Sequence, residues 1–233
     1  MAITTAVARV ISKMAEQQFF TGRKLTMIEL GATEVSWNMP GLPFVIDRDV
    51  VTQLYNNFGI KDAEQHIASD RMSGSLFKRF GFEYRCIDMT NLPFEMLKWD
   101  LNIIECPPEH LGRYLLTTNL GTSEHVFNQY NVFRLIHDLT SVGGYIVNSL
   151  PSNGWLDHSF FNYSPVFFKK LASANGYALN FIGLVVFEYQ GNKLLTSLSA
   201  LPPRKEDYPP WFSTCAVFTK KNNDEFKMPY DVF

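Results

Sequence analysis

Short apolar runs alternate with amphipathic helical patterns along most of this chain, and this alternation restricts the possible fold more than any other feature. Each run has the length of a buried strand, and several end at a glycine or a carboxylate. The predicted strands are residues 25–31, 84–88, 96–100, 114–118, 145–150, 179–189 and 214–219. Strands that alternate with helices predict an α/β fold, with a mainly parallel sheet and helices on both faces.

The length and composition fit one domain. The chain has 233 residues, of which 46% are hydrophobic and 15% aromatic, so it can bury one sizeable core. Two helical patterns, at residues 50–58 and 67–80, lie between the first two predicted strands, where an α/β unit usually needs only one helix. We therefore predict a single domain over residues 1–233, with an enlarged helical segment near 36–81, close to the ligand-binding edge of the sheet.

The charges and the cysteines exclude several classes of function. Lys and Arg number 21 against 23 Asp and Glu, and no basic run suits a phosphate backbone, so we expect no nucleic-acid partner. Cys86, Cys106 and Cys215 have no metal-binding or disulfide spacing, which fits a reducing compartment. The longest apolar run, residues 181–187, is too short to cross a bilayer. We predict a soluble cytoplasmic protein with no membrane partner.

A run of small and polar residues, 119–129, follows the fourth predicted strand and leads into an amphipathic helix. Thr122 or Ser123 is the expected cap of that helix, and Glu124 would complement its dipole. In open α/β sheets, ligands bind at the edge where the strands end in such loops. The run therefore predicts a binding site for a small molecule.

This run and four later segments resemble a branch of the class I S-adenosylmethionine-dependent methyltransferases. The segments are NLGTSEHVFNQ (119–129), HDLT (137–140), GGYIVNSLP (143–151), GWLDH (154–158) and FNYSP (161–165). The resemblance extends over about residues 82–177. It implies a Rossmann-like doubly wound sheet, mainly parallel and seven-stranded, with an antiparallel edge strand. It also implies methyl transfer from S-adenosylmethionine to oxygen or nitrogen of a small molecule, such as a sugar or another small metabolite.

The resemblance places three polar residues at the cofactor. Asp88, at the end of the second predicted strand, matches the position of the acid that binds the ribose hydroxyls, where charge-assisted hydrogen bonds are favourable. Asp100 matches the position at the adenine edge, and Asn119 is expected nearby. Both aspartates can instead be ordinary turn carboxylates, because Asp is favoured at the ends of strands.

The glycine-rich turn of the family is altered in this chain. The turn reads ELGATEV over residues 29–35, so Gly31 remains while Thr33 and Val35 occupy the later glycine positions. Glycine is used there because a Cβ atom would obstruct the approach of the backbone to the ligand. Two functions stay open: a methyltransferase that keeps Glu29 and Gly31 at its cofactor, or a non-catalytic binding or assembly protein of the same fold. A nicotinamide-dependent oxidoreductase would need Gly-x-Gly-x-x-Gly, which is absent.

Two histidines are the candidate catalytic residues. His125 lies in the loop after the fourth predicted strand and His158 in the loop after the fifth, so both reach the same edge of the sheet. Histidine is the natural base near neutral pH, and either residue is expected to orient or deprotonate the acceptor, unless its role is structural. Glu124, Trp155 and Tyr163 are expected to bind the acceptor.

Metal and subunit partners are less clearly indicated. The histidine spacing lacks the adjacent-turn pair of a helical metal site, so no metal site is predicted. The proline-rich segment 202–210, followed by Trp211 and Phe212, can cover a sheet edge or contact a second copy of the chain. The second alternative predicts a homodimer.

Overall fold

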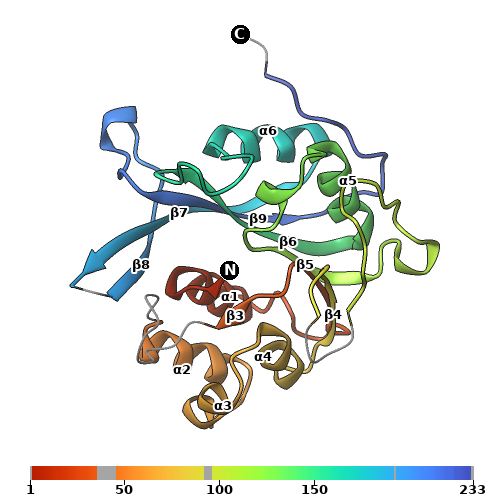
Figure 1. Cartoon of the computed structure of the whole chain (residues 1–233). Coiled ribbons are helices and arrows are strands. Elements are labelled where there is room, and N and C mark those ends of the chain that lie inside the picture. The colour runs from red at the N-terminus through yellow and green to blue at the C-terminus, as the bar shows by residue number, and fades with distance from the viewer. Residues whose placement is uncertain (1, 36–45, 92–95, 192, 232–233) are drawn as a thin grey trace.

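A computed structural model describes residues 2–35, 46–91, 96–191 and 193–231 of the chain. Its centre is a seven-stranded sheet in the order β4-β2-β5-β6-β9-β7-β8 (Figure 1). The strands are β2 (Thr26–Leu30), β4 (Glu83–Ile87), β5 (Tyr114–Asn119), β6 (Thr140–Asn153), β7 (Ala178–Gln190), β8 (Lys193–Ser199) and β9 (Phe212–Thr219). The α/β prediction is thus confirmed.

The sheet is mixed rather than mainly parallel. The pairings β4–β2, β2–β5 and β5–β6 are parallel, whereas β6–β9, β9–β7 and β7–β8 are antiparallel. Two residues, 191 and 192, separate β7 from β8, and a connection of that length can join only antiparallel strands. The prediction of a mainly parallel sheet with one antiparallel edge strand is therefore wrong for this half of the sheet.

The sheet has the predicted number of strands, but one member differs. The predicted strand at residues 96–100 is reduced to a single bridge between Ile87 and Leu97, so β4 forms this edge of the sheet. At the opposite edge lies β8, which was not predicted. Its Leu194 and Thr196 are buried in alternation with more exposed neighbours, which is the pattern of a strand with one covered face.

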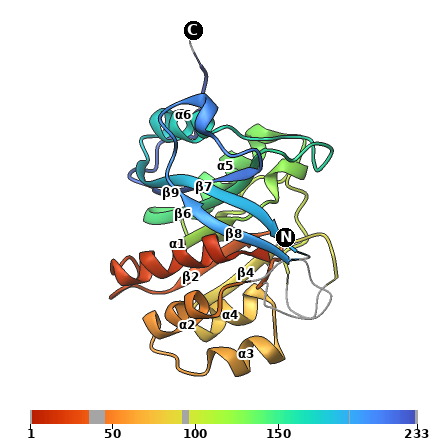
Figure 2. The ribbon, with the colours of Figure 1, turned by 90° about the vertical axis from the view of Figure 1, so that its left-hand side faces the viewer.

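Helices cover both faces of the sheet, and each face has its own apolar core (Figure 2). Met27 of β2 packs with helices α1, α2 and α4, whereas its neighbour Ile28 packs with α5 and α6, because successive side chains of a strand point to opposite faces. The helices are α1 (Thr5–Glu16), α2 (Arg48–Asn57), α3 (Ala63–Ser69), α4 (Ser73–Arg79), α5 (Gln129–Leu139) and α6 (Pro165–Asn175), with short 3-10 turns η1 (Pro108–His110), η2 (Ser123–His125) and η3 (Lys205–Asp207).

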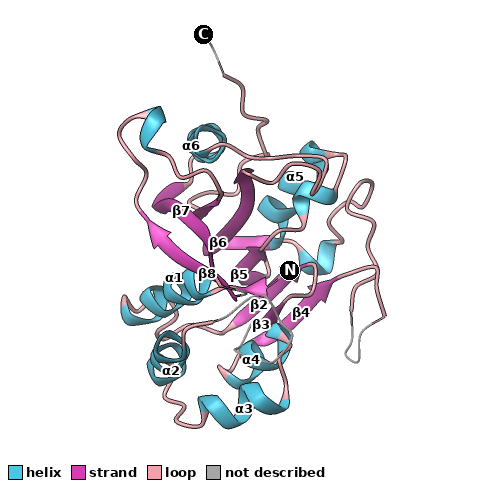
Figure 3. Cartoon of the chain, turned by 60° about the vertical axis from the view of Figure 1, so that its left-hand side comes forward, coloured by secondary structure: helices cyan, strands magenta, loops and turns pink. Residues whose placement is uncertain are grey.

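The segment predicted as enlarged lies between β2 and β4. It holds α2, α3 and α4, grouped near these two strands (Figure 3), and residues 36–45 fall outside the part that the structure describes. The short strand β3 (Glu34–Val35) follows β2 and pairs in parallel with β1 (Ala2–Ile3) at the N-terminus. Among the described residues, none of the helices is long and apolar enough to span a membrane.

The helix after β5 begins later than its sequence predicts. Asn128 caps α5 by accepting the backbone N–H of Asn131 at 3.1 Å, whereas neither Thr122 nor Ser123 is the cap. Residues Ser123–His125 form the separate turn η2. The prediction failed because Thr122, Ser123 and Asn128 are all residues that favour caps. Because α5 begins at Gln129, Glu124 and His125 lie outside the helix, in the turn η2.

Candidate cofactor cavity and acceptor site

A cavity of about 500 Å³ lies where β2, β4 and β5 end. These three strands are parallel neighbours, so their carboxyl ends and the loops that follow meet at one edge of the sheet. The volume is within the usual range for small-molecule sites. The cavity is lined by Gly31, Ala32, Thr33, Ile87, Asp88, Met89, Thr90, Trp99, Asp100, Leu101, Asn102, Gly121, Thr122, His125 and Val126.

Gly31 lies where the loop after β2 contacts the loop after β5. Its φ angle is +69°, a left-handed conformation that favours glycine, and a Cβ atom at this position would lie 2.2 Å from Oγ1 of Thr122. The hydroxyl of Thr122 donates a hydrogen bond to the carbonyl oxygen of Leu30 at 2.6 Å. The loop after β5 therefore touches the backbone of the loop after β2, and this close approach requires glycine.

Two predicted cofactor carboxylates lie at the cavity. Asp88 accepts hydrogen bonds from the backbone N–H of Ala32 at 2.8 Å and from the N–H and hydroxyl of Thr90, both at 2.7 Å. Burial raises the pKa of Asp88, but these hydrogen bonds outweigh it, so the pKa lies below its ordinary value. Asp100 is exposed, and hydrogen bonds from Asn102 lower its pKa. Both carboxylates are therefore ionised near neutral pH.

Glu29 does not line the cavity. Its carboxylate is fully buried and accepts hydrogen bonds from the hydroxyls of Thr33 at 2.8 Å, Ser73 at 2.6 Å and Tyr84 at 2.6 Å. Burial raises its pKa above the ordinary value, and the three hydroxyls offset only part of that rise. Thr33, which replaces a glycine of the family turn, therefore has a structural partner. Val35, at the other glycine position, is buried in β3.

Asn119 and Tyr163 hold the turn η2 in place. The side-chain amide of Asn119 donates to the hydroxyl of Ser123 at 2.9 Å, and its oxygen accepts the backbone N–H of Ser123 at 3.2 Å. The hydroxyl of Tyr163 is hydrogen-bonded to Gln129 at 2.6 Å and lies 3.2 Å from that of Ser123. Both residues are buried and neither lines the cavity. Their hydrogen bonds position Glu124 and His125.

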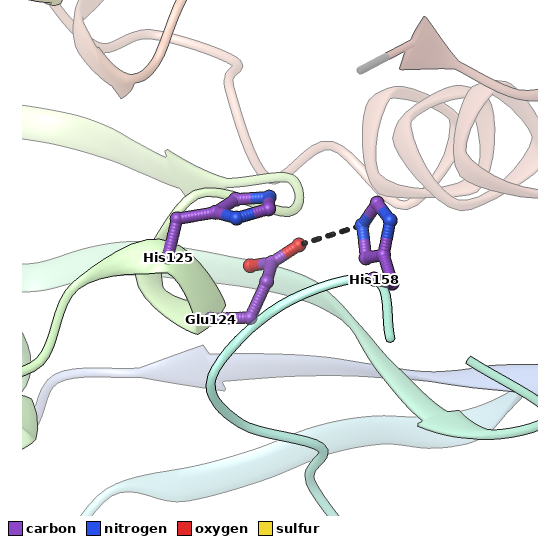
Figure 4. Close-up of side chains that lie close together, drawn as sticks. All are labelled: Glu124, His125 and His158. Atoms are coloured by element: carbon purple, nitrogen blue, oxygen red, sulfur yellow. Dashed lines mark ion pairs between the residues drawn. The ribbon is translucent and has the colours of Figure 1, made fainter. Parts of the chain in front are cut away.

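Glu124, His125 and His158 come together beside the cavity (Figure 4). The Glu124 carboxylate lies between the two imidazole rings, and its Oε1 is 4.0 Å from Nε2 of His158. The centroids of the two rings are 5.2 Å apart. The carboxylate is fully buried and has no hydrogen-bond partner among the residues that the structure describes, and burial raises its pKa to about 7. Burial and the neighbouring His158 lower the pKa of His125.

Trp155 supports this cluster from the side. Its ring centroid lies 4.9 Å from that of His158, and its indole N–H donates to the carbonyl oxygen of Phe212 at 3.1 Å. Trp211, which follows the proline-rich segment, packs against Trp155 and stacks on Phe187. Trp155 does not line the cavity, so its predicted contact with the acceptor stays a prediction.

Sequence reasoning did not find the apolar walls of the cavity. Met89, Trp99, Leu101 and Val126 line it, and a tryptophan directly before the predicted Asp100 was the available signal. A second cavity of about 450 Å³ lies under the C-terminal segment and is mainly apolar. It is bordered by α5 and α6 and contains none of the predicted site residues. The cavity at the strand ends is therefore the better candidate.

Comparisons with known proteins show the fold but identify no sequence relative. Protein-family models and curated proteins gave no match. Among solved structures, the Burkholderia thailandensis 1,6-didemethyltoxoflavin-N1-methyltransferase, with bound 1,6-didemethyltoxoflavin and S-adenosylhomocysteine, has a TM-score of 0.51 at 11% identity, over 94% of this chain and 80% of that one. A methyltransferase from Archaeoglobus fulgidus has a TM-score of 0.49 at 12% identity, over 91% and 93%.

Proposed function

Because the chain has the class I S-adenosylmethionine-dependent methyltransferase fold, we propose that it transfers a methyl group to oxygen or nitrogen of a small-molecule acceptor. The observation that carries this proposal is the cavity at the ends of β2, β4 and β5, in which Gly31 and an ionised Asp88 face the same space. Ligands of open α/β sheets bind at this edge.

The residues of the cavity fit the cofactor. The Asp88 carboxylate can accept a hydrogen bond from a ribose hydroxyl at Oδ2, which has a further lone pair beyond its contact to Ala32, whereas Oδ1 already accepts two hydrogen bonds from Thr90. Trp99 and Leu101 offer apolar walls to an adenine ring, and Asp100 lies at their edge. We assign Glu29 a supporting role, since its hydrogen bond to Thr33 fixes the loop after β2. S-adenosylmethionine, when bound, supplies an electrophilic methyl group on a positive sulfur atom.

The cluster beside the cavity is the proposed acceptor side. His125 borders the cavity and His158 lies next to it, so either imidazole can orient the acceptor or take its proton. Burial keeps the pKa of His125 below its ordinary value, which favours the neutral form that a base requires. Glu124 and Trp155 hold His158 between them, and Asn119 and Tyr163 fix the turn that carries His125.

Calorimetric titration with S-adenosylhomocysteine tests the proposal. The wild-type chain should bind one molecule, and Asp88→Asn should bind it at least about 10-fold more weakly, because a hydrogen bond to a charged group contributes about 1.5–3 kcal/mol. Asp207→Asn, in the exposed turn η3, is the matched control and should leave the affinity unchanged. A folded wild-type chain without affinity for the ligand would refute the proposal and favour the non-catalytic binding or assembly protein.

A further inference from the structure

Glu124 carries a buried carboxylate that the described residues leave without a hydrogen bond. Both of its oxygens are inaccessible to solvent, and the contact of Oε1 with Nε2 of His158, at 4.0 Å, is too long for a hydrogen bond. Leaving a buried carboxylate in this state is costly, and buried charges are normally paired or bound to a metal ion. Backbone groups of the same turn do have hydrogen bonds: the N–H of Ser123 donates to Asn119, and its carbonyl oxygen accepts from Gln129. The unmet hydrogen-bonding capacity therefore belongs to the carboxylate of Glu124.

Two imidazoles face this carboxylate from separate loops. His125 follows it in η2, and His158 comes from the loop after β6. The backbone carbonyl oxygen of Glu124 accepts the N–H groups of Phe160 at 3.1 Å and Phe161 at 3.3 Å, so that loop is fastened to the turn. One donor atom from each of the three side chains lies within 4.8 Å of the other two. Both histidines are exposed, so a ligand can reach them from solvent.

We propose that Glu124, His125 and His158 bind one divalent transition-metal ion. A carboxylate with two imidazoles is a donor set for zinc and for first-row transition metals, whereas magnesium and calcium prefer oxygen donors alone. Three protein ligands leave at least one coordination position open. The histidine spacing could not predict this site, because His158 joins the pair Glu124-His125 only through the fold.

The site closes on an ion by small side-chain movements. Metal–ligand bonds of about 2.0–2.2 Å place tetrahedral donors roughly 3.4 Å apart, so the donor atoms must approach by about 1 Å or slightly more. Rotation of the exposed rings of His125 and His158 can supply this movement, while the buried Glu124 stays fixed. The ring of Trp155 beside His158 limits the rotation on one side.

The ion gives the acceptor side a chemical role. His125 borders the cavity, so an ion held by this cluster would lie beside the space assigned to the cofactor. An acceptor hydroxyl bound to the ion would release its proton to solvent water more easily, because the positive charge stabilises the resulting oxyanion, which would then take the methyl group from the sulfur atom. With the ion bound, the histidines act as ligands, and the ion takes over the activation of the acceptor. Metal binding itself does not depend on the proposed methyl transfer.

Titration of the tag-free, metal-stripped full chain with Co²⁺, followed by visible absorption, tests the site. One ion should bind per chain, Zn²⁺ should displace it, and the absorption should indicate nitrogen and oxygen ligands. Glu124→Gln and His158→Ala should each weaken binding at least about 100-fold, since even residues that only orient ligands change affinity 10–100-fold. His66→Gln is the matched control, because His66, in α3, is hydrogen-bonded to Tyr55 of α2 and lies outside the cluster.

The outcomes separate this inference from the proposed function. Absence of Co²⁺ binding to the folded wild-type chain, or equal affinity in Glu124→Gln, would overturn the metal site. Circular dichroism of each variant shows whether it is folded, and His158→Ala gives a second test because His158 is exposed. S-adenosylhomocysteine affinity of the metal-free wild type is measured separately. Cofactor binding without metal binding would overturn only the metal site, and the reverse result would overturn only the methyltransferase.

Discussion

Replacement of Gly31 by alanine should destabilise the chain by about 2–3 kcal/mol, as the sum of two separable contributions. The first is the left-handed backbone, which costs a residue with a Cβ atom about 1–2 kcal/mol. The second arises because the new Cβ atom would lie 2.2 Å from Oγ1 of Thr122. That hydroxyl must move and lose its hydrogen bond to Leu30, at a cost of about 1 kcal/mol.

Two further variants separate the contributions. Gly22 also has a φ of +69°, but a Cβ atom there meets nothing within 4 Å, so Gly22→Ala should show only the backbone cost. In a Thr122→Ala background the obstructing hydroxyl is gone, and Gly31→Ala should again cost about 1–2 kcal/mol. Equilibrium unfolding in guanidinium chloride measures each free energy, provided that the denaturant dependence is unchanged. Equal costs of Gly31→Ala with and without Thr122 would refute the close contact.

Two other buried groups give measurable effects on stability. Burial, with the nearby charge of Lys220, lowers the pKa of His137 to about 4, whereas its pKa in the unfolded chain is about 6.5. Protonation of His137 therefore opposes folding. The free energy of unfolding should fall by up to about 3 kcal/mol as the pH decreases from above 6.5 toward 4. Unfolding measured from pH 7 to 4.5 should show a shallower slope for His137→Gln. Tyr84→Phe removes one of three hydroxyls from Glu29 and should lower the unfolding free energy by about 1–3 kcal/mol, and an unchanged denaturation midpoint would argue against that hydrogen bond.

The parallel half of the fold follows from the sequence, and the antiparallel half does so only in part. Strands β2, β5 and β6 are apolar runs separated by long segments. Parallel pairing requires a crossover connection of a dozen or more residues, and these segments are long enough to provide it. The order of β7, β8 and β9 depends on pairings between distant residues, which a local pattern does not encode. β8 was missed because its alternation of buried residues is confined to Leu194 and Thr196.

The site shows the same division between local pattern and packing. Gly31 and Asp88 reach one cavity because each follows the carboxyl end of a strand, which a sequence reveals, whereas Asp100 reaches it from the loop that follows the single bridge at Leu97. The sequence could also have predicted that Glu29 points into the core, because it lies on the same face of β2 as Met27, which is part of the core beside α4. Its three hydroxyl partners come from separate elements, and no sequence spacing predicts that set.

One difference between expectation and structure, the later start of α5, coincides with the candidate acceptor site. Had α5 begun at Thr122 or Ser123, Glu124 would lie in the first turn of a helix, where its charge would be solvated and stabilised by the helix dipole. Capping by Asn128 instead leaves Glu124 in a separate turn, which Asn119 and Tyr163 hold with its carboxylate buried. Several hydrogen bonds therefore hold this turn in a conformation in which the described residues donate no hydrogen bond to the Glu124 carboxylate. Buried groups held in this way are typical of functional sites, because only a ligand then satisfies them.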